Sequence, residues 1–144
     1  MTVTEEQIRS IIDDRIGALR AQDAKRFLNH MEVGFSSFEL APPLQYLDND
    51  PTSTTGLDLW FSTFEDEVLY EVRDLRIAVG DPLSYCHSLY HIKGNKKDGE
   101  KVDLWARQTL CFREGPQGLK ISHTHMSVPF NMDREHKAAI DLKP

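Results

Sequence analysis

Apolar residues recur at helical spacing in three parts of the chain. Thr4 to Gln7 match a capping box, in which a threonine and a glutamine three residues later satisfy backbone amides reciprocally. A helix is predicted over residues 5–21, because the apolar residues after the capping box recur at helical spacing: Ile8, Ile11, Ile12, Ile16 and Leu19. Asp23 predicts the N-cap of a short second helix that carries Phe27, Leu28 and Met31. A third helix is predicted over residues 55–66 from Leu57, Trp60, Phe61 and Phe64.

Most of the remaining chain has the composition and alternation that are typical of strands. Residues 34–40 predict a short strand that stops before Pro42-Pro43, because proline cannot continue a central strand. Residues 45–56 are polar and contain proline and glycine, so they predict the longest loop. Four more strands are predicted over residues 68–79, 84–93, 102–113 and 118–128, with polar turns at 95–99 and 114–118. After Phe130 we predict one short helix, which begins at Asp133.

The order of these elements indicates the fold class. Helices come first and four strands follow in series, joined by short turns, which is typical of an α+β arrangement with antiparallel neighbours. We expect three helices to cover one face of a strongly curved sheet, with a cavity between the two layers. The 144 residues fit one domain, and no repeat or linker divides them, so we predict a single domain over residues 1–144.

Composition narrows the choice of partners and compartment. The net charge of −6 argues against a nucleic-acid partner, which usually requires a basic surface. No apolar run is long enough to cross a membrane, and the first ten residues lack the pattern of a secretory signal. Cys86 and Cys111 lie in predicted strands and are expected to be free thiols in a reducing cytoplasm. We therefore expect a cytoplasmic protein with neither a nucleic-acid nor a membrane partner.

A row of polar and aromatic residues follows the last two predicted strands. Alternate residues of a strand share one face, so His123, His125 and Ser127 project from the same side of their strand. Trp105, Arg107 and Thr109 do the same on the neighbouring strand. We interpret this row as the lining of a pocket, although a hydrogen-bonded network that holds the sheet together would place the same residues there.

The pairing of these two strands indicates possible roles. A symmetric turn over residues 114–118 would place Arg107 opposite His125 and Thr109 opposite His123, about 5 Å apart. Arg107 would then anchor an anion or a carbonyl group, and His125 or His123 would act as an acid or a base. His87 and His91 come from an adjacent strand and, with the other two histidines, raise the alternative of a metal site. Nothing in their spacing requires a metal, and we predict none.

Other residues complete the candidate site. Glu39 is the best carboxylate for a general base if it faces a dry cavity, where burial would raise its pKa; the alternative is an exposed strand residue. Trp60, Phe64 and Trp105 either line an apolar pocket or serve as core aromatic residues. Together with His87, Thr109, His123 and Ser127 they form the predicted ligand-binding set, whereas Glu39, His125 and Arg107 form the predicted catalytic set.

Several segments carry a resemblance to a known family. They are residues 98–105 (DGEKVDLW) with Arg107 and Thr109, residues 123–130 (HTHMSVPF), residues 40–44 (LAPPL), and Trp60-Phe61. On these residues the chain resembles the SnoaL-like, ketosteroid-isomerase-homologue family of small bacterial proteins, within the nuclear transport factor 2-like superfamily. The resemblance covers nearly the whole chain. It implies a cone-shaped α+β fold, a homodimer formed through the sheet, and a site that works without a cofactor.

The chain also departs from that family. The isomerase branch uses a tyrosine of the first helix as an oxyanion donor, and the matching position here is Ile16. It also uses an aspartate before a proline as a proton shuttle, and that position is Ala41. Neither residue can do this chemistry, so the resemblance does not imply steroid isomerisation. Glu39 lies two residues before Ala41, on the same face of a regular strand, and could present a carboxylate from a shifted position.

Three hypotheses for function remain open on the sequence. The first is a binding or accessory protein whose cavity takes a small, largely apolar molecule. The second is a cofactor-free isomerase, cyclase or dehydratase, in which Glu39 or His125 moves a proton while Arg107 and Thr109 hold a developing oxyanion. The third is a dimerisation module with a vestigial pocket.

Overall fold

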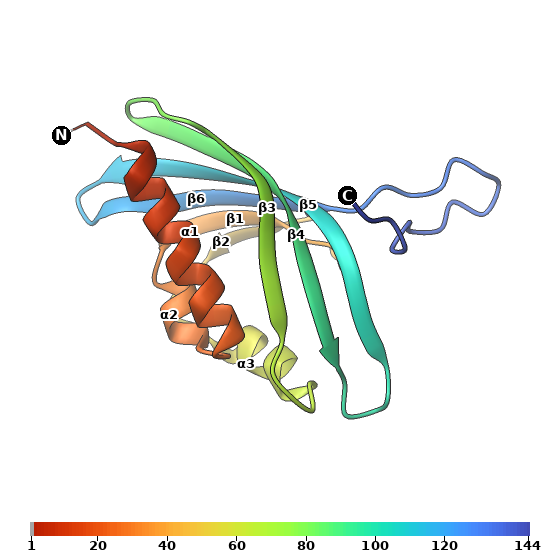
Figure 1. Ribbon diagram of the computed structural model, residues 1–144. Coiled ribbons are helices and arrows are strands. Elements are labelled where there is room, and N and C mark those ends of the chain that lie inside the picture. Colours follow the sequence, from red (N-terminus) through yellow and green to blue (C-terminus); the bar gives the residue numbers. More distant parts are fainter. Residues whose placement is uncertain (1) are drawn as a thin grey trace.

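A six-stranded, strongly curved sheet forms the body of the protein, and three helices lie on one side of it (Figure 1). The computed structural model describes residues 2–144. Its elements are α1 (Glu5–Arg20), α2 (Ala24–Leu28), β1 (Met31–Phe38), β2 (Tyr46–Asn49), α3 (Thr55–Ser62), β3 (Leu69–Ala78), β4 (Leu83–Asn95), β5 (Lys101–Gly115) and β6 (Gly118–Ser127).

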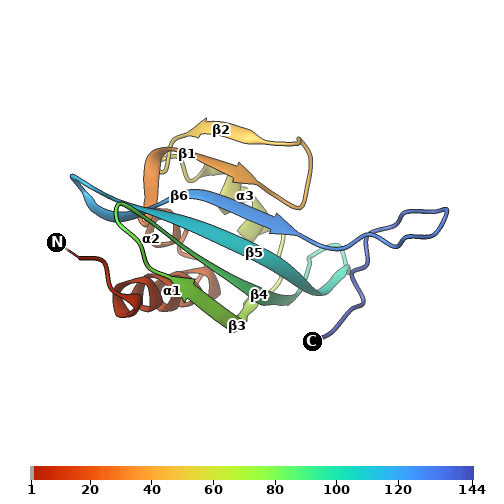
Figure 2. The same ribbon diagram turned by 90° about the horizontal axis from the view of Figure 1, so that it is seen from above.

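The strand order in the sheet is β2-β1-β6-β5-β4-β3. The chain runs antiparallel from β3 to β6, as the short turns predict, and β6 then pairs in parallel with β1. This crossing brings the end of β1 beside the end of β6, although the two are far apart in the sequence (Figure 2). Among residues 2–144 no helix combines the length and the apolar character that crossing a membrane requires.

Helix α1 begins where the capping box predicts. The Gln7 amide donates to Thr4 Oγ1 at 3.2 Å, and the Thr4 amide donates to Gln7 Oε1 at 2.8 Å. The buried side of the helix carries Ile8, Ile12, Arg15, Ala18 and Leu19. One charged residue therefore lies in an otherwise apolar stripe, which faces the concave side of the sheet.

Two apolar clusters fill the space between the helices and the sheet. The first joins Ile8 and Ile12 of α1 to Cys86, Leu110 and Ile121. The second joins the end of α1 and α3 to the other half of the sheet, and its buried members are Leu19, Ala24, Phe61, Phe64, Val68, Tyr70, Tyr90 and Ala106. Strand residues of both clusters alternate along β4 and β5, which identifies the concave face as the inner face.

Several predicted boundaries and elements are wrong. The first strand, predicted over residues 34–40, is β1 at Met31–Phe38, so Met31 begins β1 rather than ending α2, and α3 stops at Ser62. The predicted loop contains β2, whose pairing with β1 is supported by Asn49 Nδ2, which donates to the Phe35 carbonyl at 2.7 Å. After Phe130 there is no helix, because Asp133 Oδ1 accepts from the amides of Glu135 and His136 and closes a turn instead.

The predicted register of β5 and β6 is also wrong, by two residues. Arg107 pairs with Ser127, and Thr109 pairs with His125. The hairpin turn contains only two residues between Gly115 and Gly118, which shifts the pairing by one. A bulge between Cys111 and Phe112 shifts it by one more. Because the two shifts add to an even number, Arg107 and Thr109 of β5 still lie on the same face as His125 and Ser127 of β6, as predicted.

Candidate functional site

The predicted polar row lies on the outer face of the sheet, opposite the helices. Ala106, Gln108 and Leu110 of β5 are buried on the inner face, so Trp105, Arg107 and Thr109 point outward. The same alternation places His87 and His91 of β4, and His123, His125 and Ser127 of β6, on the outer face. The row therefore does not line the space between helices and sheet, because burial alternates along each strand and the helices cover the other side.

Side chains of the outer row bind one another. The His91 ring stacks on Trp105 with a centroid distance of 4.6 Å, and His91 Nε2 lies 2.6 Å from Asp103 Oδ1. Ser36 Oγ lies 2.7 Å from His123 Nδ1, and Arg107 Nε donates to Ser127 Oγ at 3.2 Å. These contacts match the alternative interpretation of the row as a network that joins neighbouring strands.

Two predicted aromatic pocket residues, Trp60 of α3 and Phe64 just after its end, lie on the inner side. Phe64 is 4% exposed and belongs to the second core cluster, and the partly buried Trp60 packs against that cluster. Their rings meet edge to face, with centroids 4.9 Å apart. Both residues therefore contribute to the core at the wide end of the sheet.

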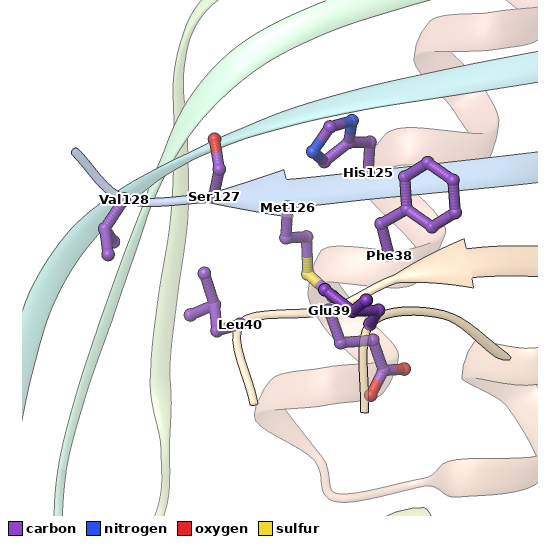
Figure 3. A pocket seen from close by; sticks show the side chains of 8 residues that line it. Phe38, Glu39, Leu40, His125, Met126, Ser127 and Val128 are labelled. Carbon is purple, nitrogen blue, oxygen red and sulfur yellow. The ribbon is translucent and has the colours of Figure 1, made fainter. Parts of the chain in front are cut away.

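A pocket of about 320 Å³ opens where β1 and β6 end (Figure 3). Its lining is Phe38, Glu39, Leu40, Leu44, His125, Met126, Ser127 and Val128. In Figure 3 the His125 ring and the Ser127 hydroxyl lie on one side of β6, while the Glu39 carboxylate, Met126 and Val128 lie on the other. Two predicted catalytic residues thus border one pocket from opposite faces of the sheet, and we call its Glu39 side the inner mouth.

Glu39 keeps contact with solvent at the inner mouth, but its carboxyl group is partly covered. Burial raises the pKa of this carboxyl, and a hydrogen bond from Ser37 opposes the rise. Burial is the main cause that raises the pKa of the Tyr90 hydroxyl. Nearby Tyr70 adds to this effect, and the charge of Glu39 makes a smaller contribution, so Glu39 lies near Tyr90. Glu39 is thus an exposed residue just after β1, and the raised pKa of its carboxyl makes the carboxylate a stronger base than an ordinary glutamate.

A second group of polar side chains lies deeper on the inner face. Gln108 pairs across the strands with Met126 of the inner mouth, and its Nε2 donates to the Tyr70 hydroxyl at 3.2 Å. The Arg15 guanidinium lies near Tyr70, and burial raises the pKa of the Tyr70 hydroxyl, so Tyr70 keeps its proton at neutral pH. Ser88 pairs with Gln108 on the same face. We call Ser88, Gln108, Tyr70 and Arg15 the inner polar row; Tyr70 is 5% exposed and the other three are each 6% exposed.

The sequence interpretation missed the inner polar row. One signal was present, because Arg15 falls at helical spacing with Ile8, Ile12 and Leu19 and so interrupts the apolar stripe of α1. The family resemblance places Ile16 at the position of the oxyanion-donor tyrosine. The buried polar residue in this turn of α1 is its neighbour, Arg15. Gln108 and Tyr70 gave no comparable signal, because each is a single polar group in a strand of mixed composition.

Histidine and cysteine side chains form no further site in the part of the chain that is described. No group of three or more His, Cys, Asp or Glu side chains within residues 2–144 is arranged to hold a metal ion. Cys86 and Cys111 are both free. Burial raises the pKa of the Cys86 thiol to about 11, so Cys86 remains protonated and unreactive at neutral pH.

Comparison with known proteins identifies a family and similar structures. A family model described as a SnoaL-like domain matches residues 8–131. An NTF2-like protein of unknown function from Pseudomonas putida has a similar structure, with a TM-score of 0.85, 22% identity and full coverage of both chains. No curated protein matches the sequence significantly.

Two other solved structures are similar over most of the chain. A nuclear transport factor 2 (NTF2-like) superfamily protein from Salmonella enterica has a TM-score of 0.74 and 14% identity, with 90% of this chain and 93% of that chain covered. A proposed dehydratase of the NTF2-like family from Streptomyces avermitilis has a TM-score of 0.71 and 15% identity, with 85% and 93% covered. These likenesses confirm the predicted α+β, nuclear transport factor 2-like fold.

Proposed function

Because the chain belongs to the SnoaL-like domain family, we propose that it binds a small organic molecule on the concave side of its sheet. The observation that carries this proposal is the pocket at the end of β1 and β6, where Met126 of its lining pairs across the strands with Gln108 of the inner polar row. Ligand sites are typically concave and largely apolar, with a few polar groups that fix orientation. Leu40, Met126 and Val128 supply the apolar part of the lining here, and Glu39, His125 and Ser127 supply polar groups.

The size of the pocket limits the ligand. A volume of about 320 Å³ lies at the lower end of the range for small-molecule sites, which runs from roughly 300 to 1,000 Å³. One aromatic ring with one or two substituents fits this space better than a polycyclic compound.

Titration of ¹⁵N-labelled protein with a set of neutral single-ring compounds, benzamide among them, tests the proposal. We expect the largest amide shifts at Glu39, Met126 and Val128, and we expect them to disappear in Val128→Trp, which fills the inner mouth. Val79→Trp is the matched control, since Val79 is 46% exposed at the end of β3. Shifts confined to the outer face, or unchanged in Val128→Trp, would contradict the proposal.

A second candidate function is cofactor-free proton transfer by Glu39. The raised pKa of its carboxyl favours this role, because a base works best when its pKa approaches the working pH. His125 and Arg107 lie on the other face of the sheet, so in this proposal Glu39 acts without them. Once a substrate is found, Glu39→Gln should abolish turnover while ligand binding persists, and turnover at the parent rate would exclude Glu39 as the base.

We further propose that two copies of the chain meet through the outer face. Leu83 and Tyr85 point outward from β4 and are 57% and 46% exposed, and Leu69 on β3 is 38% exposed. Leu69 and Trp105 lie toward one end of these strands, and Leu83 and Tyr85 lie toward the other, so apolar side chains are exposed along much of the outer face. Cytoplasmic location remains a prediction of the sequence.

A further inference from the structure

Arg15 is a buried cation without a counter-ion. Its side chain lies on the inner stripe of α1 with 6% of the residue exposed, and its Nε donates no hydrogen bond to any atom of residues 2–144. It takes part in none of the ion pairs formed within that range. Neighbouring Asp14 is not available, because it pairs with Arg26 and His30 at 2.6 Å each.

The contacts of Arg15 cover one face of its guanidinium and leave its Nε–H without an acceptor in the described part of the chain. Its Cζ lies 4.1 Å from the centroid of the Phe27 ring, which is a cation–π contact. Such a contact offsets part of the loss of hydration but provides no hydrogen-bond acceptor. Burial lowers the pKa of Arg15, which is the expected response of a charge that lacks a partner.

Tyr70 adds a second uncommitted donor. Its hydroxyl oxygen accepts from Gln108 Nε2 at 3.2 Å, so its own hydrogen is free to donate elsewhere. Neither Arg15 nor Gln108 Nε2 can accept that hydrogen. Arg15 Nε–H and the Tyr70 hydroxyl are therefore two hydrogen-bond donors without acceptors among the described residues. The positive charge of Arg15 also has no negative charge of residues 2–144 paired with it.

We propose that the inner polar row is a carboxylate site, in which Arg15 and Tyr70 bind the carboxylate of a small organic acid whose apolar part extends toward the inner mouth. A carboxylate supplies acceptors for both donors and one negative charge for the single arginine, and its planar geometry fits the guanidinium fork. This inference rests on the proposed binding function and names its ligand class.

Benzoate and benzamide test the inference as a matched pair, since they share a ring and differ mainly in charge. We expect benzoate to bind the wild-type protein at least about tenfold more tightly than benzamide, the difference that one charge-assisted hydrogen bond supplies. Arg15→Met should abolish that preference without weakening benzamide. Arg9→Met is the control, because Arg9 is an exposed arginine of the same helix. Tyr70→Phe should weaken benzoate alone.

The Arg15 Nε–H resonance, assigned from its absence in Arg15→Met, gives a direct readout. Benzoate should shift this resonance, and benzamide should leave it unchanged. If both compounds shift amides at the inner mouth with equal affinity, the carboxylate inference is wrong while the binding function stands. If neither compound shifts any residue of the inner face, both proposals fail.

Discussion

Arg15 is the residue whose burial is hardest to explain by folding alone. A charged group removed from water destabilises the folded state unless partners replace its hydration, and the Phe27 ring replaces only part of it. We expect Arg15→Met to increase the free energy of unfolding by about 1–3 kcal/mol, as when buried ions are exchanged for apolar side chains of similar size. Thermal unfolding in the absence of ligand measures this change; a lower melting temperature would identify Arg15 as a structural residue instead.

Glu39 predicts a dependence of stability on pH. Burial raises the pKa of its carboxyl, so the folded protein holds this proton more tightly than the unfolded chain. The resulting stability is present below the ordinary carboxyl pKa, and it is lost as the pH rises through the raised pKa of the folded state. Glu39→Gln should therefore melt at a higher temperature than the wild type at neutral pH.

The difference between wild type and Glu39→Gln should vanish at about pH 3, well below the ordinary carboxyl pKa, where the carboxyl is protonated in both states. Melting temperatures recorded from about pH 3 to about pH 8 test this. Glu65→Gln, at an exposed glutamate, is the control. A difference that stays constant over this range would show that Glu39 is not perturbed in the folded state.

At the scale of elements, the packing of α3 against the sheet depends on a close approach at Gly94. A Cβ at this position would lie 2.9 Å from two carbons of the Phe64 ring, and Phe64 is held in the core by Trp60. We expect Gly94→Ala to lower the free energy of unfolding by about 1–3 kcal/mol through overpacking. Denaturant unfolding measures this loss.

Gly56→Ala is the matched control for Gly94→Ala. Gly56 lies in α3, and nothing lies within 4 Å of a Cβ built there. Replacing a helical glycine by alanine should stabilise the protein by about 0.5–1 kcal/mol. Equal losses in the two variants would show that backbone freedom, rather than the contact with Phe64, sets the stability.

Most elements could be predicted from the sequence because strong local signals mark them. The capping box at Thr4 and the apolar spacing after it locate α1, and alternation locates β3 to β6. The register of β5 and β6 could not be predicted, because neither the two-residue turn nor the bulge near Phe112 leaves a clear pattern in the residues. Strand β2 has no apolar alternation, and only its pairing with β1 defines it.

The candidate site was harder to predict than the fold. Period-two alternation identified correctly that His123, His125 and Ser127 share a face, but it could not say which face the helices cover. That choice is made by the packing of α1 and α3 on Leu110, Tyr90 and their neighbours. The predicted role of Glu39 stays a prediction, and in the structure its carboxylate lies on the inner side of β6 (Figure 3).

At the scale of the whole molecule, the two faces of the sheet have different proposed roles. We propose that the inner face binds the ligand and that the outer face binds a second copy. A charge placed at the centre of the outer face should separate the copies, so we expect Trp105→Glu to shift the protein from dimer to monomer. Light scattering after size-exclusion chromatography measures the mass.

Leu59→Glu is the control for Trp105→Glu. Leu59 is a 68% exposed apolar residue on α3, so the same charge is added on the helical side of the molecule. The mass of Leu59→Glu should equal that of the wild type. A wild-type protein that is monomeric at all concentrations would contradict the proposed dimer without affecting the proposed ligand site.

A crystal structure of the protein with bound benzoate tests the central claim most directly. The claim is that the concave side of the sheet, from the inner mouth to the inner polar row, is a ligand site. We predict benzoate on the inner face, with its carboxylate within hydrogen-bond distance of Arg15 Nε and its ring directed toward Val128. Benzoate bound only to the outer face, with Arg15 Nε still unpaired, would contradict the claim.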